Sequence, residues 1–249
     1  MMASGAAVMT PLATGIEALV EGVPGFSPVD ELFALATLVH ATAGLPGDIV
    51  EIGSWCGRST VVLAQAAADA GGARVHAVDL FPDRADWHPN ADGTFSFRTL
   101  VDGVPFDGYA QQTVWPEAFD GILRPLYETC GNTFEIFSRV LAERGLGPAV
   151  SVHRGTSETF SRGVPDGFRC RLAFIDGDHG YEAVRRDIRA LAPLLVPGGW
   201  LCFDDAHSGY EGVDRAIAEE VLASPAFTNG RQLTRKLFVA QKSGGRRPA

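Results

Sequence analysis

The stretch Val50-Glu51-Ile52-Gly53-Ser54-Trp55-Cys56-Gly57-Arg58-Ser59-Thr60 decides the fold class of this 249-residue chain. A short apolar strand (48–53) ends in a glycine turn, and an alanine-rich helix (57–70) follows at once. Glycines at such a turn let the backbone bend tightly and let a ligand approach closely. The first turn of the helix offers free N–H groups to a polar ligand. The middle glycine of the GxGxxG pattern is missing, so a nicotinamide dehydrogenase fits this turn poorly.

Outward from this turn, strands and helices are predicted to alternate along the chain. The strands are expected at 74–80, 149–155, 171–178, 199–205 and 233–242, and the helices at 27–43, 131–144, 180–195 and 211–223. Alternation of this length favours an α/β fold with a doubly wound, mostly parallel sheet. Pro197-Gly198-Gly199 is interpreted as a tight turn that returns the chain to the sheet.

The domain organisation is predicted to be one α/β domain over 48–241. An N-terminal arm and helix (1–47) precede it, and a Gly/Pro/Arg-rich tail (242–249), expected to be disordered, follows it. Residues 82–130 break the alternation with five prolines and eight aromatic residues. A long irregular stretch of this kind is typical of a lid or a wall of a substrate pocket. The alternative is a surface excursion whose aromatic side chains fill a local core.

Acidic residues follow three of the predicted strands. Asp79 lies 26 residues after Gly53, where a carboxylate in a βαβ unit reaches the two hydroxyls of a ribose. The pairs Asp176 and Asp178, and Asp204 and Asp205, close two later strands. Parallel strands end at one edge of a sheet, so these acids are expected to converge. Like charges so close together need a cation or shared protons, and hard oxygen ligands of this kind suit Mg²⁺ or Ca²⁺. Separate aspartates that cap loops are the alternative.

Two histidines, His179 and His207, flank these acids. A histidine beside a metal site can serve as a base, a ligand or a hydrogen-bond partner of a substrate. A structural histidine in a turn is the alternative for each.

Charge and composition exclude some classes of partner. Thirty acidic and 21 basic residues give a net charge of −9, without a dense basic block. This balance excludes a nucleic-acid binder and a basic membrane-surface helix. No run of about 18 apolar residues occurs. The four cysteines form no CxxC motif, and the start of the chain lacks the features of a signal peptide, so a cytoplasmic protein is expected.

Five stretches together resemble a known family. They are EIGSWCGRST (51–60), AVDLF (77–81), HRGTSETF (153–160), FIDGDHGYEAVRRDI (174–188) and LLVPGGWLCFDD (194–205). They are similar to class I S-adenosylmethionine-dependent methyltransferases, and most similar to the O-methyltransferase branch that includes macrocin O-methyltransferase and related natural-product sugar methyltransferases. The resemblance covers about 48–241, excluding 82–130, and implies a Rossmann-like fold with a seven-stranded sheet. The N-terminal helical arm and the 82–130 insertion after the second strand are expected as additions to that fold.

The resemblance also implies roles for individual residues. Those expected around the methionine part of S-adenosylmethionine are Glu51, Gly53, Ser54, Gly57 and Ser59. Those expected at the nucleoside are Asp79 on the ribose, Leu80 and Phe81 beside the adenine, and Thr156 and Ser157 at its edge, with Asp176 also touching the cofactor. The implied Mg²⁺ ligands are Asp176, Asp204 and Asp205, and the implied base is Asp178, with His179 as the alternative.

The predicted function is therefore methyl transfer to a hydroxyl of a small molecule, a natural product or a sugar, with Mg²⁺ orienting the hydroxyl. Two alternatives remain at this point. One is a metal-free methyltransferase that uses a histidine as the base. The other is a repurposed fold that binds the cofactor without transferring its methyl group. The N-terminal arm and helix 27–43 are also candidate contacts for a homo-oligomer.

Overall fold

The computed structural model describes residues 15–244. Residues 1–14 of the predicted arm and residues 245–249 of the predicted tail lie outside the described residues. Seven strands form the main sheet in the order β6-β2-β1-β7-β8-β10-β9. Their bounds are β1 Asp48–Ile52, β2 Val75–Asp79, β6 Val150–Arg154, β7 Cys170–Ile175, β8 Leu195–Phe203, β9 Phe227–Gln232 and β10 Phe238–Lys242. Strand β10 runs antiparallel to both of its neighbours, β8 and β9, and the other strand pairs of this sheet are parallel. The predicted mostly parallel seven-stranded sheet is confirmed.

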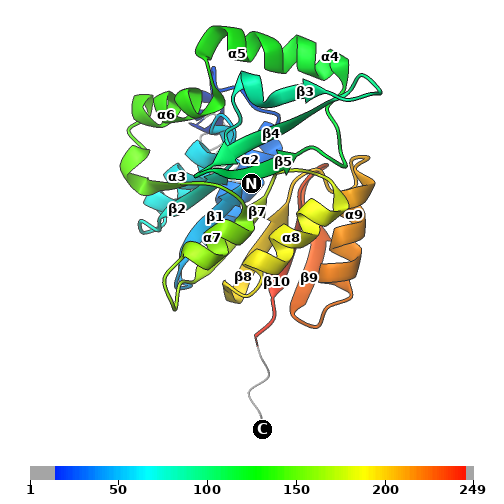
Figure 1. Cartoon of the computed structure of the whole chain (residues 1–249). Helices are drawn as coiled ribbons and strands as arrows, with labels where there is room; N and C mark the ends of the chain where they lie inside the picture. The colour runs from blue at the N-terminus through cyan, green and yellow to red at the C-terminus, as the bar shows by residue number, and fades with distance from the viewer. Residues whose placement is uncertain (1–14, 245–249) are drawn as a thin grey trace, which may run out of the picture.

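Helices cover both faces of this sheet, as Figure 1 shows. Their bounds are α2 Val29–Ala41, α3 Arg58–Asp69, α6 Thr133–Glu143, α7 Ser157–Gly163, α8 Tyr181–Leu191 and α9 Glu211–Ala216, the last continued by a π-helical segment, Ile217–Leu222. Successive strand residues point to opposite faces. Ile49 accordingly packs in the cluster formed with α2 and α3, whereas Val50 and Ile52 pack with α8 and α9. This two-sided burial explains why the central strands are mostly apolar.

Residues 82–130 form a folded subdomain, so the prediction of an irregular stretch is wrong. It holds a three-stranded antiparallel sheet and short helices: β3 Trp87–Pro89, β4 Phe95–Val101, β5 Val104–Gly108, α4 Pro116–Ala118, a π-helical segment Phe119–Leu123, and α5 Arg124–Cys130. Figure 1 shows this layer across the top of the main sheet. Asp102 (φ 51°) and Gly103 (φ 80°) form the two-residue turn between β4 and β5. An Asp-Gly pair favours a two-residue hairpin turn with positive φ at both positions, and this signal was missed.

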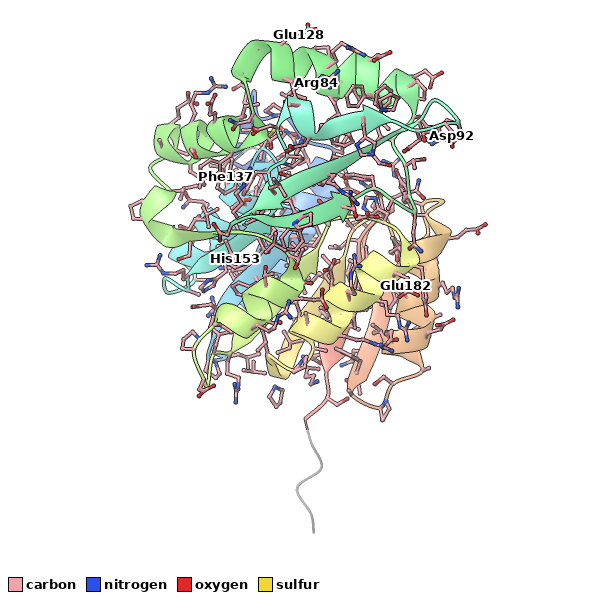
Figure 2. The ribbon with its side chains drawn as sticks, viewed as in Figure 1. Arg84, Asp92, Glu128, Phe137, His153 and Glu182 are labelled. Carbon is pink, nitrogen blue, oxygen red and sulfur yellow. The ribbon has the colours of Figure 1, made fainter. Side chains whose placement is uncertain are left out.

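The aromatic residues of this subdomain form a core of their own. Its buried members are Trp87, Phe97, Phe119, Leu123 and Tyr127. Arg84, labelled near the top of Figure 2, places its guanidinium 5.0 Å from the centre of the Phe119 ring. The local core that was weighed as the alternative for this stretch is therefore present.

Two further local predictions differ from the structure. Strand β8 begins at Leu195 and runs through Pro197-Gly198-Gly199, which form an irregularity in its pairing with β7 rather than a turn before the strand. The last predicted strand, 233–242, is shorter than expected and is preceded by β9, because residues 233–237 make the turn between β9 and β10. Within residues 15–244, no helix is long and apolar enough to cross a membrane.

Candidate active site

A cavity of about 600 Å³ opens at the carboxyl ends of the central strands. The glycine turn after β1 and the acidic loops after β2, β7 and β8 form its floor, and the 82–130 subdomain contributes Trp87, Phe97 and Tyr109 to its wall. Ligands of open α/β sheets bind at this edge, where the chain order reverses. A volume of this size is in the range of cofactor and small-molecule sites.

The glycine turn is constrained by the backbone of β7. Gly53 has φ 88°, and a Cβ atom placed on it would lie 1.9 Å from the carbonyl oxygen of Asp176. Gly57 has φ 90° and precedes α3, and a Cβ there would lie 3.1 Å from the Phe137 ring, labelled in Figure 2. The two glycines therefore let strand ends and helices approach closely. Of the predicted residues in this turn, Gly53, Ser54 and Ser59 line the cavity, whereas Gly57 lies behind it.

Glu51 holds the turn together from inside. Its carboxylate is fully buried, and Oε2 accepts hydrogen bonds from Ser54 Oγ (2.8 Å) and Thr60 Oγ1 (2.5 Å). Burial raises the pKa of this carboxyl. Glu51 does not line the cavity, so its predicted contact with a cofactor remains a prediction, and its observed role is to fix Ser54.

Asp79 ends β2 at the cavity. Its Oδ2 accepts from Trp55 N–H (2.9 Å) and its Oδ1 from Phe81 N–H (2.6 Å), so it joins the ends of β1 and β2. Burial raises its pKa. Leu80 lines the cavity, and its place beside an adenine remains a prediction. Phe81 was expected there too, but it is buried in the core with its ring centre 5.2 Å from that of Phe137.

The segment after β6 also reaches the cavity. Thr156 and Ser157 both line it, and their contact with an adenine edge remains a prediction. Thr156 precedes α7, and its hydroxyl accepts from Thr159 N–H at 3.3 Å, which caps the helix. Ser157 Oγ donates to Asp187 on α8, at 2.5 Å.

The two acids after β8 converge around a lysine. Lys236 Nζ lies 3.1 Å from Asp204 Oδ2 and 3.1 Å from Asp205 Oδ1. Asp205 has φ 55°, so the chain has already left the sheet and both aspartates reach the same spot. Burial opposes the charge of Lys236, but the two carboxylates outweigh it and raise its pKa.

Glu31 reaches the same cluster from α2, on the other side of the sheet. Its side chain is fully buried, and neither carboxyl oxygen has a hydrogen-bond partner within the described part of the chain. Burial and the charge of Asp204 raise its pKa to about 9, so the carboxyl is neutral at pH 7. Burial and Asp204 likewise raise the pKa of Asp176.

The two histidines differ in position. His179 Nε2 is buried without a hydrogen-bond partner among residues 15–244, 3.6 Å from Asp205 Oδ2 and 3.8 Å from Asp176 Oδ1. Its ring lies against Tyr210, with centres 4.5 Å apart. His207 does not line the cavity, and its half-exposed side chain pairs with Asp214 instead.

Asp178 joins the acidic loop to the 82–130 subdomain. Its Oδ2 accepts from Tyr109 N–H (2.7 Å), and its Oδ1 accepts from Gly180 N–H (2.8 Å). Both oxygens are therefore engaged by backbone donors. Gln111 makes a second link, since its Oε1 accepts from Glu182 N–H at 3.1 Å.

The donor set fits a divalent cation. Asp176, His179 and Asp204 each place one ligand atom within 4.8 Å of the others. Asp204 Oδ1 and His179 Nε2 are buried without hydrogen-bond partners among the described residues, as expected of atoms that can bind a cation. Lys236 engages the other oxygen of Asp204. Of the predicted ligands, Asp176 and Asp204 belong to this set, whereas Asp205 Oδ1 is engaged by Lys236 and Ser208.

Three side chains of this site were not found from the sequence: Glu31, Lys236 and Asp187. Tyr109 belongs to the aromatic 82–130 stretch that the sequence predicts as a lid or a pocket wall. Lys236 carried a weak signal, since it is one of only two lysines in the chain. Glu31 lies in the first turn of α2, where acidic residues are common because they interact favourably with the helix dipole. The sequence therefore does not distinguish it from an ordinary first-turn acid.

The fold and the cavity define an α/β enzyme whose glycine turn and strand-end acids face one ligand site. A family model described as a methyltransferase domain matches residues 50–206, well over half of the chain. The chain belongs to this methyltransferase family. The predicted class of enzyme, a methyltransferase, is confirmed.

Several solved structures share the fold of this chain. The O-methyltransferase NovP is 17% identical, with a TM-score of 0.65 over 96% of this chain and 99% of that one. The O-methyltransferase TomG from Streptomyces achromogenes, involved in tomaymycin synthesis and solved with SAM, is 15% identical, with a TM-score of 0.55 over 94% and 89%. An O-methyltransferase from Bacillus cereus in complex with SAH is 15% identical, with a TM-score of 0.54 over 97% and 93%.

Proposed function

We propose that this protein transfers the methyl group of S-adenosylmethionine to a hydroxyl of a small molecule, with a divalent cation beside the acceptor. The observation that carries the proposal is the single cavity, which joins the glycine turn and Asp79 to the cluster of Asp176, His179 and Asp204. Neighbours of similar fold that were solved with SAM or SAH support the cofactor. TomG's role in tomaymycin synthesis favours a natural product as the acceptor, and a sugar hydroxyl is retained within that proposal.

The chemistry is an in-line displacement. The hydroxyl oxygen forms a bond to the methyl carbon, the carbon–sulfur bond breaks, and the sulfur leaves as the neutral thioether of S-adenosylhomocysteine. S-adenosylmethionine supplies the activated methyl group, and Mg²⁺ supplies a Lewis acid that favours ionisation of the hydroxyl. Much of the rate then comes from alignment of the reacting atoms.

The residues of this chain divide the remaining work. Ser54 and Asp79 would hold the cofactor, and Asp176 and Asp204 would hold the cation. His179 has a free ring nitrogen at the cluster, whereas both oxygens of Asp178 already accept backbone N–H groups. His179 Nε2 can either bind the cation or accept a proton, but not both at once. We infer that Asp176 and Asp204 hold the cation without it, that the acceptor's proton passes to His179, and that Asp178 orients the loop carrying it.

Isothermal titration with S-adenosylhomocysteine and a turnover assay on a panel of catechols and glycosides test the proposal. The wild type should bind the nucleoside, and EDTA should abolish turnover. Asp178→Asn and His179→Gln should retain binding and lower kcat, the latter by about 10²-fold or more. A protein that binds no S-adenosylhomocysteine would refute the proposal.

One observation favours a second candidate, a metal-free methyltransferase. Lys236 already neutralises part of the acidic cluster, with contacts of 3.1 Å to both Asp204 and Asp205. Full turnover in excess EDTA would support this candidate and remove the cation from the scheme.

A further inference from the structure

The ring of Tyr109 lies at the acidic end of the cavity, on the wall that the 82–130 subdomain provides. Tyr109 lines the cavity, and its backbone N–H donates to Asp178 Oδ2 at 2.7 Å. Asp178 comes directly before His179 and two residues after Asp176, so Tyr109 is joined to the loop that carries both. Burial raises the pKa of the Tyr109 phenol, and the charges of Asp178 and Asp176 raise it further. The ring is therefore a neighbour of the proposed cation site.

The backbone of Tyr109 is held in a conformation that bulky residues rarely adopt. Its φ is 55°, in the left-handed region that favours glycine. Ser96 Oγ donates to the carbonyl oxygen of Tyr109 at 2.8 Å, while Asp178 accepts from its N–H. At the preceding residue, Gly108, a Cβ atom would overlap the Phe97 ring, so the chain also passes close over the subdomain core. Strain of this kind persists only where the surrounding structure enforces it, and it is concentrated at active sites and ligand clamps.

Tyr109 extends an aromatic wall into the cavity. Trp87, which also lines the cavity, stacks on the Tyr109 ring with centres 5.8 Å apart and planes at 27°. Phe97 approaches the same ring edge-on, at 6.0 Å and 65°. Tyr109 itself is only half-buried. Part of its ring is therefore available to a ligand in the cavity.

The polar side chains of this wall are already paired, with one exception. Trp87 Nε1 donates to Tyr127 Oη at 2.9 Å, and that hydroxyl donates to the carbonyl oxygen of Pro82, also at 2.9 Å. Asp107 is engaged in an ion pair of 2.6 Å. Among the cavity-lining side chains of the subdomain, this leaves only the Tyr109 hydroxyl without a hydrogen-bond partner in the described part of the chain. The wall could pair few of the hydroxyls around a sugar ring, whereas the face of an aromatic ring needs no such partner.

We propose that Tyr109 is a specificity-determining residue, whose clamped ring stacks on a planar aromatic acceptor and thereby selects a phenol over a sugar. This inference rests on the proposed function, because it takes the cavity to hold a methyl acceptor beside the cation. Stacking on Tyr109 brings a hydroxyl at the edge of the acceptor toward Asp176 and His179, since the loop that clamps Tyr109 also carries these side chains. An offset-stacked aromatic pair gains affinity that a saturated ring does not gain.

Two substitutions of Tyr109 separate stacking from a purely structural role. Tyr109→Phe keeps the aromatic face and removes only the hydroxyl, so it should keep the preference for an aromatic acceptor. Tyr109→Leu removes the face and keeps the backbone strain, because leucine adopts positive φ no more readily than tyrosine. Trp115→Leu is the matched control, since Trp115 belongs to the same subdomain, is 67% exposed and does not line the cavity. Binding of S-adenosylhomocysteine reports whether the site of each variant is intact.

The experiment is calorimetric titration of three diols into each protein, saturated with S-adenosylhomocysteine and Mg²⁺. The diols are catechol, the non-planar cis-1,2-cyclohexanediol and the sugar methyl α-D-mannopyranoside, which all offer neighbouring hydroxyls to a cation. The wild type should bind catechol about tenfold more tightly than either saturated diol. Tyr109→Leu should weaken catechol binding by about three- to tenfold and the binding of the other two by less than about twofold. Tyr109→Phe and Trp115→Leu should match the wild type.

Two results overturn the inference and leave the proposed function in place. One is a wild type that binds S-adenosylhomocysteine but binds catechol no more tightly than either saturated diol. The other is a Tyr109→Leu variant that binds S-adenosylhomocysteine normally and loses affinity for all three diols equally, or for none of them. A wild type that binds no S-adenosylhomocysteine overturns the proposed function, and this inference with it.

Discussion

Glu31 offers the sharpest test of the charge arrangement in the site. It is fully buried beside Asp204, and its pKa rises from the ordinary value of 4.5 to about 9 because of burial and the charge of Asp204. In the unfolded chain at pH 7 the carboxyl is ionised, so folding must bring a proton to it. Each pH unit between 4.5 and 7 costs about 1.4 kcal/mol, or about 3 kcal/mol in total. Glu31→Gln keeps the shape and removes this cost.

The sign follows from the direction of the shift. An acid with a raised pKa contributes its stability below the unfolded value and loses it as the pH rises toward the folded value. The free energy of unfolding of the wild type should therefore fall, relative to that of Glu31→Gln, by about 1.4 kcal/mol per pH unit between pH 5.5 and 7.5. At pH 7.5 the variant should be the more stable protein.

Urea denaturation in EDTA at several pH values measures this difference without interference from metal ions. Glu128→Gln, an exposed position labelled in Figure 2, is the matched control and should follow the wild type. Parallel stability curves for the wild type and Glu31→Gln across this range would show that Glu31 is ionised in the folded protein, and would refute the reasoning.

Two further predictions concern the framework of the site. Gly53→Ala should lower the free energy of unfolding by about 3 kcal/mol or more in urea denaturation, because its Cβ would lie 1.9 Å from a backbone oxygen at positive φ. Gly145→Ala, which meets open space, should cost about 1 kcal/mol, and equal losses would contradict the proposed clash. Lys236→Met should lower the free energy of unfolding in EDTA by about 3 kcal/mol. Adding Mg²⁺ should then raise the melting temperature of this variant by more than it raises that of the wild type or of Lys242→Met. Absence of any Mg²⁺ effect on the Lys236 variant would count against the metal site.

The glycine turn and the acids at the strand ends could be predicted because local rules govern them. A strand that ends in glycine before a helix places Gly53 and Ser54 at the sheet edge, and parallel strands bring Asp79, Asp176 and Asp204 to that same edge. No knowledge of distant contacts is needed for this step. The Asp102-Gly103 hairpin is equally local, because an Asp-Gly pair between two strands itself favours a two-residue turn with positive φ at both positions.

The partners of these acids could not be predicted in the same way. Glu31 belongs to a helix on the far side of the sheet, yet its carboxyl meets Asp204, which is 173 positions later in the chain. Lys236 arrives from the turn between β9 and β10. Residues that are adjacent in sequence can also be separated by the packing. Leu80 lines the cavity, whereas its neighbour Phe81 packs in the core.

The sequence by itself therefore determined the alternation of strands and helices in the centre of the main sheet, the ligand-binding edge of that sheet and the acids that face it. These features depend on residue periodicity and on turn geometry within short segments. The tertiary structure alone decided which side chains neutralise the acids, which oxygens remain free, and how the 82–130 subdomain joins Asp178. Burial and charge pairing depend on residues that are distant in sequence, and their effects appear only when the packed chain brings them together.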